Sequence, residues 1–292
     1  MKPAPFAYHA ARTVKEAVSL LGEFQDGGRV LAGGQSLVPL MNFRLARPSH
    51  LVDINPVEEL DYIRRADGVL AIGARTRQAA AERSPLVRDQ APLLAEALGW
   101  VGHEPIRHRG TVVGSIAHAD PAAEIPAVAL ALDGEVTALS TRGERTIAAA
   151  DFFRGPFATA LEPRELVTEL RLKIWPPGTG YAFLEFARRH GDFAIAGAGV
   201  LLHLGPGGVD QAAVVLCGVG DTPVRARRAE ERLLGHPPTP EALDEAAEAA
   251  VADLTPPGDV HGSPQYRRKV ARAYVRRALT LALERARRGG RP

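Results

Sequence analysis

Two glycine-rich segments contain residue types suited to binding a phosphate group. The first, Ala32-Gly33-Gly34-Gln35-Ser36, lies between a short apolar run at 29–32 and a run of helical composition at 37–45. Glycines let successive backbone N–H groups point into one concavity, and a helix N-terminus adds partial positive charge. A strand-to-helix turn with Ser36 as N-cap is the ordinary alternative for the same residues.

A second segment, "RHRGTVVGSIAHADPAAEIP" at 107–126, repeats this chemistry with Gly110, Thr111, Gly114 and Ser115 before a polar stretch and a helix. The pyrophosphate of a dinucleotide carries two negative charges. A pair of amide-rich loops suits such a group, because each loop can hold it from one side. The two segments together favour a dinucleotide site over two unrelated turns.

Other common site chemistries find little support. "GAGVLL" at 197–202 and "GVGDTP" at 218–223 lack the third glycine and the strand–turn–helix setting of a Rossmann fingerprint, and they indicate glycines in strands or turns. His103 and His108 are five residues apart with Pro105 between them, which differs from helical zinc motifs. His118 and Asp120 lack two further ligands nearby. We therefore expect no metal site.

The single cysteine, Cys217, excludes intramolecular disulfides and any all-cysteine iron–sulphur cluster within this chain. Its apolar surroundings, "VVLCG", predict a core thiol. A reducing cytoplasm is the natural compartment. No apolar stretch approaches the roughly 20 residues that span a bilayer, and the first residues lack the apolar core of a signal peptide.

The chain has 292 residues, 46% hydrophobic, and a net charge of +2, so length and composition predict two globular domains and no general affinity for nucleic acid. Basic residues cluster after Tyr266. Helical spacing of Val270, Tyr274, Ala278 and Leu281 predicts a packed helix there with a solvated arginine face, rather than a nucleic-acid or membrane-surface helix.

The pattern of elements predicts an α+β chain with a domain boundary at 176–180, "PPGTG". Thr13 and Glu16 form a capping box, Asp67-Gly68 indicates a hairpin turn, and residues 99–126 have an irregular pattern. Helices are expected at 15–24, 37–45, 76–83, 91–98, 123–132, 225–234, 240–252 and 263–288. Strands are expected at 29–32, 51–55, 61–65, 69–74, 135–139, 145–147, 165–174, 181–189, 193–204 and 209–219.

Four stretches, in this order and spacing, resemble the FAD-binding medium subunit of the molybdenum hydroxylases, the family of xanthine dehydrogenase and carbon monoxide dehydrogenase. They are "AGGQSLVPLMNFRLARPSHLVDIN", "IRHRGTVVGSIAHADPAAEIPAV", "FARRHGDFAIAG" and "DVHGSPQYRRKVARAYVRRAL". The resemblance implies a two-part FAD-binding domain of the vanillyl-alcohol oxidase and p-cresol methylhydroxylase type at 1–177. It also implies a C-terminal domain of a small antiparallel sheet and helices at 178–292.

The resemblance assigns no catalytic residue, and it implies the following FAD-binding positions: Leu31, Ala32, Gly33, Gly34, Gln35, Ser36, Leu37, Trp100, Gly110, Thr111, Gly114, Ser115, His118, Asp120, Glu124, Leu166, Val167 and Phe193. Two positions depart from the family pattern. Val113 stands where a glycine is usual, which would strain the loop if its φ were positive. Glu185 stands where some relatives have a lysine near the flavin.

The resemblance further implies an electron-transfer subunit that works with a large molybdenum-cofactor chain and a small [2Fe–2S] chain, as a dimer of heterotrimers. The complex would be cytoplasmic or associated with the membrane through its partners. Two alternatives remain open at this point. One is a self-sufficient flavin oxidoreductase, and the other is a scaffold with a vestigial nucleotide site. The substrate and the terminal acceptor are not encoded in these residues.

Overall fold

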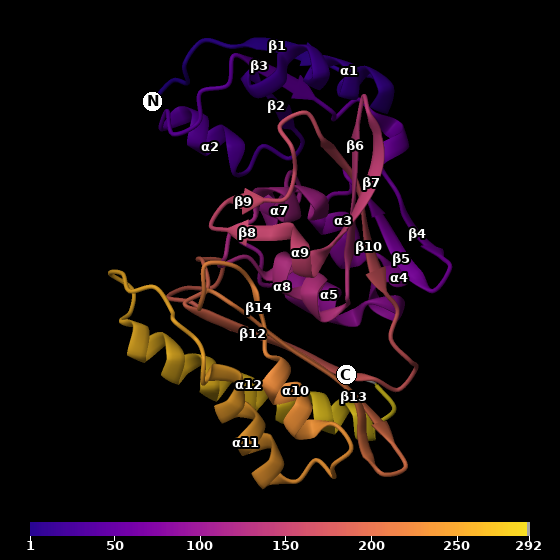
Figure 1. Ribbon diagram of the computed structural model, residues 1–292, viewed down its shortest axis with the longest axis vertical. Helices are drawn as coiled ribbons and strands as arrows, with labels where there is room; N and C mark the ends of the chain where they lie inside the picture. The colour runs from indigo at the N-terminus through magenta and orange to yellow at the C-terminus, as the bar shows by residue number, and fades with distance from the viewer. Residues whose placement is uncertain (291–292) are drawn as a thin grey trace.

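A computed structural model describes residues 1–290, which form three parts along the long axis of the molecule (Figure 1). The N-terminal lobe, residues 1–60, contains a parallel sheet in the order β1-β3-β2. Its elements are β1 (Ala7–Ala10), α1 (Val14–Phe24), β2 (Gly28–Leu31), α2 (Leu37–Asn42) and β3 (His50–Asp53). Thr13 caps α1 as predicted, because its side chain accepts from the Glu16 N–H at 3.1 Å.

The central part, residues 61–177, is built on an antiparallel sheet in the order β4-β5-β10-β6-β7. Its strands are β4 (Ile63–Ala66), β5 (Val69–Gly73), β6 (Glu135–Ser140), β7 (Gly143–Ala148) and β10 (Leu166–Lys173). The predicted hairpin at Asp67-Gly68 is confirmed. Both residues have positive φ, +50° and +77°, as a type I′ turn requires.

Helices and a short hairpin cover this sheet. They are α3 (Gln78–Arg83), α4 (Pro85–Gln90), α5 (Pro92–Leu98), α6 (Glu104–Arg107), α7 (Val112–His118), α8 (Glu124–Ala131), α9 (Ala149–Phe152), β8 (Phe153–Gly155) and β9 (Ala158–Thr159). The irregular pattern predicted for 99–126 is therefore wrong in part. Short helices α6 and α7 form there because Thr111 caps α7 and Pro105 occupies the first turn of α6.

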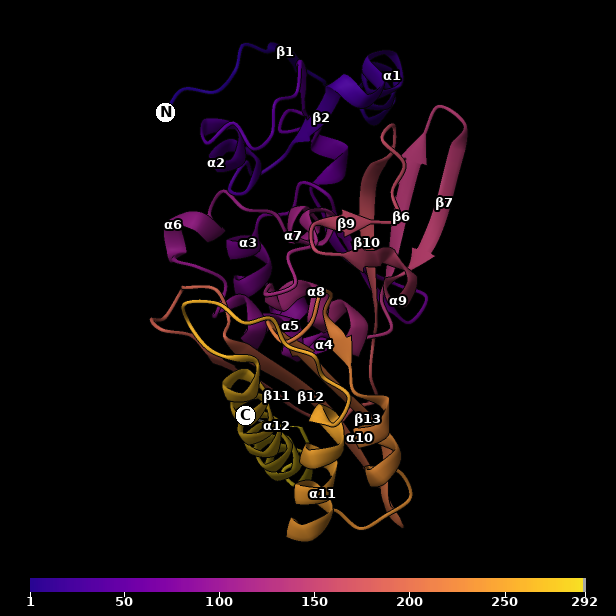
Figure 2. The same cartoon turned by 60° about the vertical axis from the view of Figure 1, so that its left-hand side comes forward.

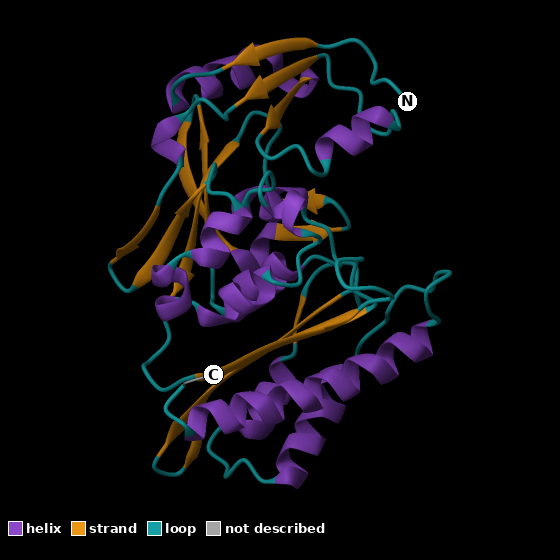
Figure 3. Ribbon diagram, turned by 180° about the vertical axis from the view of Figure 1, so that it is seen from behind, coloured by secondary structure: helices purple, strands orange, loops and turns teal. Residues whose placement is uncertain are grey.

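The C-terminal part, residues 178–290, is a sheet in the order β11-β12-β13-β14 with three helices. The elements are β11 (Gly180–Phe186), β12 (Ala196–Gly205), β13 (Gly208–Cys217), β14 (Val224–Arg225), α10 (Arg227–Leu233), α11 (Pro240–Val251) and α12 (Pro264–Arg287). This sheet lies between its own helices on one side and α5 and α8 of the central part on the other (Figure 3).

Alternate residues of these strands enter two different hydrophobic cores. Phe183 and Val215 pack with the core of the first two parts, whereas Ala182, Val200 and Val214 pack against the C-terminal helices. Successive side chains of a strand point to opposite faces, so a sheet covered on both faces needs apolar residues at every position. This explains the continuous apolar runs at 194–202 and 212–217.

The apolar face of α12 differs from the prediction. Ala271, Val275, Ala278 and Ala282 are fully buried, while the predicted Val270, Tyr274 and Leu281 lie at the flanks of the face. Alanines mark the face because the sheet approaches closely. A Cβ at Gly180 would lie 1.9 Å from the Ala282 carbonyl oxygen.

The arginine face of α12 is also not wholly solvated. Arg267 is 5% exposed, donates to the carbonyl oxygens of Ile195 (2.8 Å) and Gly218 (3.0 Å), and pairs with Asp259 at 2.6 Å. Within residues 1–290, no helix has the length and hydropathy needed to cross a membrane.

Candidate cofactor site

The two glycine segments touch one another in the structure. We call residues 32–36 the first loop and residues 109–115 the second loop. A Cβ built at Gly33 would lie 2.5 Å from the Arg109 carbonyl oxygen and 2.7 Å from the Gly110 Cα. Real side chains do not fit at such distances, so glycine at position 33 is what allows the two backbones to meet.

The first loop presents unused hydrogen-bond donors. Among the described residues, the backbone N–H groups from Gly33 to Leu37 donate to no protein group. Ser36 occupies the N-cap position of α2, but its side chain makes no capping hydrogen bond. The alternative interpretation, in which Ser36 serves only to cap the helix, is therefore wrong. Gly34 has φ +72°, a conformation that glycine adopts without strain. Free N–H groups grouped in this way form an anion-binding surface.

The second loop is the start of helix α7 rather than an open loop. Thr111 is its N-cap, accepting from the Gly114 N–H at 3.0 Å, and the Val112 N–H donates to Thr76. The N–H groups of Thr111 and Val113 have no protein acceptor within residues 1–290. The second loop therefore contributes fewer donors than expected, and the start of α7 adds its partial positive charge.

Val113 is not strained. It lies in the first turn of α7, it does not belong to the residues with positive φ, and it is 2% exposed within the core. The valine is thus compatible with the helix, and it gives no support to a vestigial nucleotide site.

A network of polar side chains that the sequence reasoning missed holds the two loops together. Asn55 donates to the Ala32 carbonyl oxygen of the first loop at 2.9 Å and accepts from Arg77 at 2.5 Å. Arg77 also donates to the Arg109 carbonyl oxygen of the second loop. The Asn55 side chain also donates to the Asp53 carboxylate at 2.5 Å. The signal for this network in the sequence is the pair of polar residues, Asp53 and Asn55, near the end of the strand predicted at 51–55.

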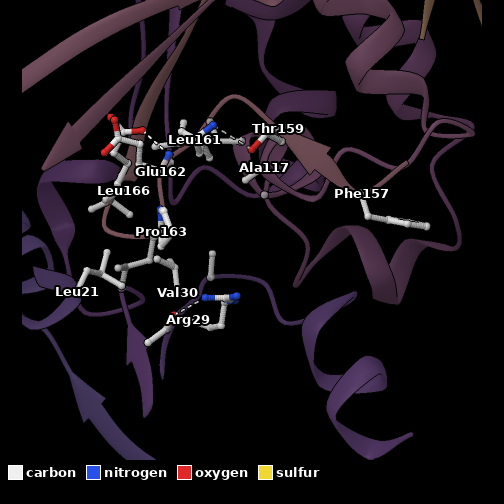
Figure 4. A pocket seen from close by; sticks show the side chains of 18 residues that line it. Leu21, Arg29, Val30, Ala117, Phe157, Thr159, Leu161, Glu162, Pro163 and Leu166 are labelled. Atoms are coloured by element: carbon white, nitrogen blue, oxygen red, sulfur yellow. Dashed lines mark hydrogen bonds between the residues drawn. The ribbon is translucent and has the colours of Figure 1, made fainter. Parts of the chain in front are cut away.

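A pocket of about 390 Å³ lies beside the loops, between the N-terminal lobe and the central part (Figure 4). The predicted residues Ala32, Gly114, Leu166 and Val167 line it. Both β10 residues belong to the lining, so the structure does not separate them. Arg29 and Val30 line the lower side, and Thr159, Leu161 and Glu162 line the upper side, as Figure 4 shows.

Other predicted residues lie at the C-terminal end of α7 or just after it. His118 ends α7, half-buried against the Phe157 ring, and burial lowers the pKa of its imidazole. Asp120 accepts from the Ala122 N–H at 2.9 Å, and Glu124 is 7% exposed at the start of α8. These residues do not line the pocket.

Trp100 and Phe193 lie on either side of the boundary with the C-terminal part. The Trp100 ring stacks on His190 at 5.4 Å, and a Cβ at Gly191 would lie 2.6 Å from the His103 ring. The loop between β11 and β12 therefore packs against the segment that follows α5 (Figure 2). Phe193, in the same loop, is 75% exposed.

The chain matches, over residues 4–173, the family model described as the FAD-binding domain in molybdopterin dehydrogenase. The chain belongs to this family. A second model, the carbon monoxide dehydrogenase flavoprotein C-terminal domain, matches residues 181–282. The predicted family, the α+β fold class and FAD as cofactor are thereby confirmed, and the chain is an oxidoreductase subunit.

Relatives match this FAD-binding subunit along nearly its whole length. It is 46% identical to the 6-hydroxypseudooxynicotine dehydrogenase complex subunit alpha of Paenarthrobacter nicotinovorans, covering 98% of this chain and 97% of the relative. It is 39% identical to the carbon monoxide dehydrogenase medium chain of Hydrogenophaga pseudoflava, covering 97% and 98%. A solved structure of carbon monoxide dehydrogenase from that organism superposes with TM-score 0.95 at 40% identity, covering 98% of this chain and 99% of that chain.

The residues of the FAD-binding subunit fit a dinucleotide at the two loops. FAD brings a diphosphate with many acceptor oxygens, and the first loop brings N–H donors that the protein leaves free. The adjoining pocket is lined by apolar residues along α7 and β10, as small-molecule sites usually are. Its volume lies in the range that is common for ligand pockets.

Proposed function

We propose that this FAD-binding subunit passes electrons from iron–sulphur clusters of a partner chain, through FAD, to an external acceptor. The observation that carries the proposal is the contact of the two loops at Gly33, with free N–H groups on the first loop. FAD, when bound, supplies the redox chemistry. The single cysteine supports the division of labour, because an all-cysteine cluster needs ligands that this chain does not have.

Within this proposal, the chain's own residues bind and orient the cofactor. The N–H groups of Gly33, Gly34 and Gln35 would hold the diphosphate together with the start of α7. Leu166 and Val167 would contact an apolar part of FAD, while Trp100, His118, Asp120, Glu124 and Phe193 would serve the end nearer to the C-terminal part. The Asn55–Arg77 network would fix the spacing of the loops.

We further propose the assembly that the relatives suggest. They are named as medium chains or subunits of dehydrogenase complexes, which supports a large molybdenum-cofactor partner and a small [2Fe–2S] partner, arranged as a dimer of heterotrimers. A domain boundary at 177/178 remains a prediction from the Pro and Gly residues at 176–180, and the change of sheet between β10 and β11 supports it. The cytoplasmic location remains a prediction of cysteine usage.

Reconstitution of the purified chain tests the proposal. The chain should bind FAD in a one-to-one ratio, measured by flavin absorbance that elutes with the protein on gel filtration. In the intact complex, purified through a tag on this chain, molybdenum and iron should co-purify, and the flavin band should bleach when substrate reduces the complex. A folded chain that takes up no flavin contradicts FAD binding. A flavin band that substrate does not bleach contradicts the electron path.

A further inference from the structure

The turn of the β8–β9 hairpin contains an aromatic residue in a backbone conformation that suits glycine. Its two central residues are Pro156 and Phe157, between the paired residues Gly155 and Ala158. Phe157 has φ +56°. A turn with proline at its first central position and positive φ at the second normally carries glycine there, because a side chain in the left-handed region is strained. Phenylalanine at position 157 therefore has a conformational cost that glycine would avoid.

Burial of the Phe157 side chain recovers little of this cost. The side chain is 61% exposed, and its ring lies against the His118 ring with 5.1 Å between the two centroids. The backbone is nevertheless held in place, because the Phe157 N–H donates to the Ala119 carbonyl oxygen at 3.0 Å. Ala119 is the C-cap of α7. The turn is thus fixed on the C-terminal end of α7, with one aromatic ring largely open to solvent.

The exposed ring belongs to the pocket that the two glycine loops border. Phe157 lines this pocket together with Ala32 of the first loop and Gly114 of the second loop. In Figure 4, Phe157 lies on the opposite side of the pocket from Leu21 and Leu166. Helix α7 has seven residues and is therefore about 10 Å long. The ring and the start of α7, where the loops meet, lie at opposite ends of this short helix.

The chemistry of this end of the pocket suits a planar ring. Burial lowers the pKa of His118, so its imidazole is neutral at pH 7, and Phe157 carries no charge. Neutral aromatic rings bind other flat rings through stacked or edge-to-face contacts, and they offer nothing to a phosphate group. Strained backbone conformations are concentrated at ligand sites, where the bound ligand gives the strained residue its use.

We propose that Phe157 is an aromatic platform for the flavin ring of FAD, and that contact with the flavin offsets the strain of the turn. This inference rests on the proposed function, under which the diphosphate binds at the two loops. FAD has two planar rings, adenine and flavin. The flavin must exchange electrons with other molecules, so it needs the exposed side of the pocket, where Phe157 lies. Leu21 and Leu166, on the opposite side, are 1% and 2% exposed.

The apo chain tests the strain without any cofactor. Phe157→Gly removes the cost of positive φ and very little buried area, so its urea denaturation midpoint should exceed that of the wild type. Phe43→Gly is the matched control. Phe43 is 66% exposed, but its φ is −82°, so glycine there relieves no strain and should lower the midpoint. A midpoint for Phe157→Gly at or below that of the wild type overturns the stored strain.

Titration with FAD and with ADP tests the contact. Phe157→Gly should bind FAD about tenfold more weakly than the wild type, the effect of losing one aromatic contact, whereas Phe43→Gly should bind FAD as the wild type does. ADP has the diphosphate and adenine but no flavin, so it should bind wild type and Phe157→Gly equally. Equal FAD affinities for these two chains overturn the platform. An equal loss for FAD and ADP overturns its assignment to the flavin. Absence of FAD binding by the wild type contradicts the proposed function instead.

Fluorescence of the bound flavin gives a signature that a purely structural residue would not change. An indole ring in contact with a flavin quenches its fluorescence by donating an electron to the excited flavin. Phe157→Trp should therefore bind FAD as the wild type does and show lower fluorescence per bound flavin. Phe43→Trp adds an indole at a similarly exposed position outside the pocket lining, and its bound flavin should fluoresce as in the wild type. Equal fluorescence for Phe157→Trp and wild type overturns the contact.

Discussion

At the scale of single residues, Gly33 sets how closely the two loops approach, because the backbone of Arg109 and Gly110 fills the space that a side chain would take. The loops must meet for one diphosphate to contact both. An extra methyl group in such tight packing forces backbone shifts that typically cost about 1–3 kcal/mol. Adding one methyl group at position 33 therefore tests whether the two loops must touch for the cofactor to bind.

We predict that Gly33→Ala weakens FAD binding at least tenfold while the chain still folds. The substitution separates the two loops, so the donors no longer converge on one anion. FAD titration followed by flavin fluorescence measures the effect, and circular dichroism checks the fold. Gly207→Ala is the control, since a Cβ at Gly207 has open space around it. If both variants bind FAD equally well, the loops do not need to touch for binding.

At the scale of elements, α3, α7 and β3 position the loops through side chains that no motif announces. Arg77 precedes α3, Asn55 follows β3, and their hydrogen bonds end on carbonyl oxygens of the two loops. These hydrogen bonds use the backbone carbonyl oxygens of the loops, so the N–H donors of the first loop stay free for a ligand.

We predict that Arg77→Met destabilises the chain by about 2 kcal/mol, because it removes a half-buried cation that donates to the half-buried Asn55 side chain and to the exposed Arg109 carbonyl oxygen. FAD affinity should fall more than tenfold, since the loops lose their common tether. Urea denaturation and FAD titration give the two quantities. Arg65→Met, at an exposed position on β4, should change neither. An Arg77→Met chain with unchanged FAD affinity would show that the network is not needed for the site.

The sequence predicted elements well where periodicity and turn chemistry are local. The cap of α1 at Thr13, the hairpin at Asp67-Gly68 and the long C-terminal strands all follow from such local rules, although the Glu16 side chain accepts from the Arg12 N–H and so does not complete the predicted capping box. It failed where long-range packing decides. Helix α7 was missed because its cap, Thr111, sits among glycines, and strand β1 forms only because β3 lies beside it.

In the candidate site too, the features set by local sequence could be predicted and those set by long-range packing could not. The glycine loops are visible as local composition. The Asn55–Arg77 network joins segments 22 residues apart and leaves no local pattern. The position of Phe157 against the end of α7 depends on how the β8–β9 hairpin packs on that helix, which periodicity does not encode.

At the scale of the whole molecule, the C-terminal sheet serves both domains, and the last helix ties them together. Arg285 of α12 reaches Glu96 of α5 with a closest approach of 2.9 Å and donates to the Tyr181 carbonyl oxygen at 2.7 Å. Glu96 also accepts from the Phe183 N–H at 3.1 Å. The side chains of Arg285 and Glu96 are 14% and 24% exposed, so water screens the pair weakly.

We predict that Glu96→Ala lowers the free energy of unfolding by about 3 kcal/mol, because removing one partner leaves Arg285 unpaired in a largely buried place. The loss falls on the contact between the domains, so in calorimetry we expect one unfolding transition for the wild type and two for Glu96→Ala. Glu248→Ala, which breaks the exposed pair with Arg272, should cost well under 1 kcal/mol and keep one transition. If Glu96→Ala unfolds as the wild type does, apolar packing along β11 and β12 holds the domains together without this ion pair.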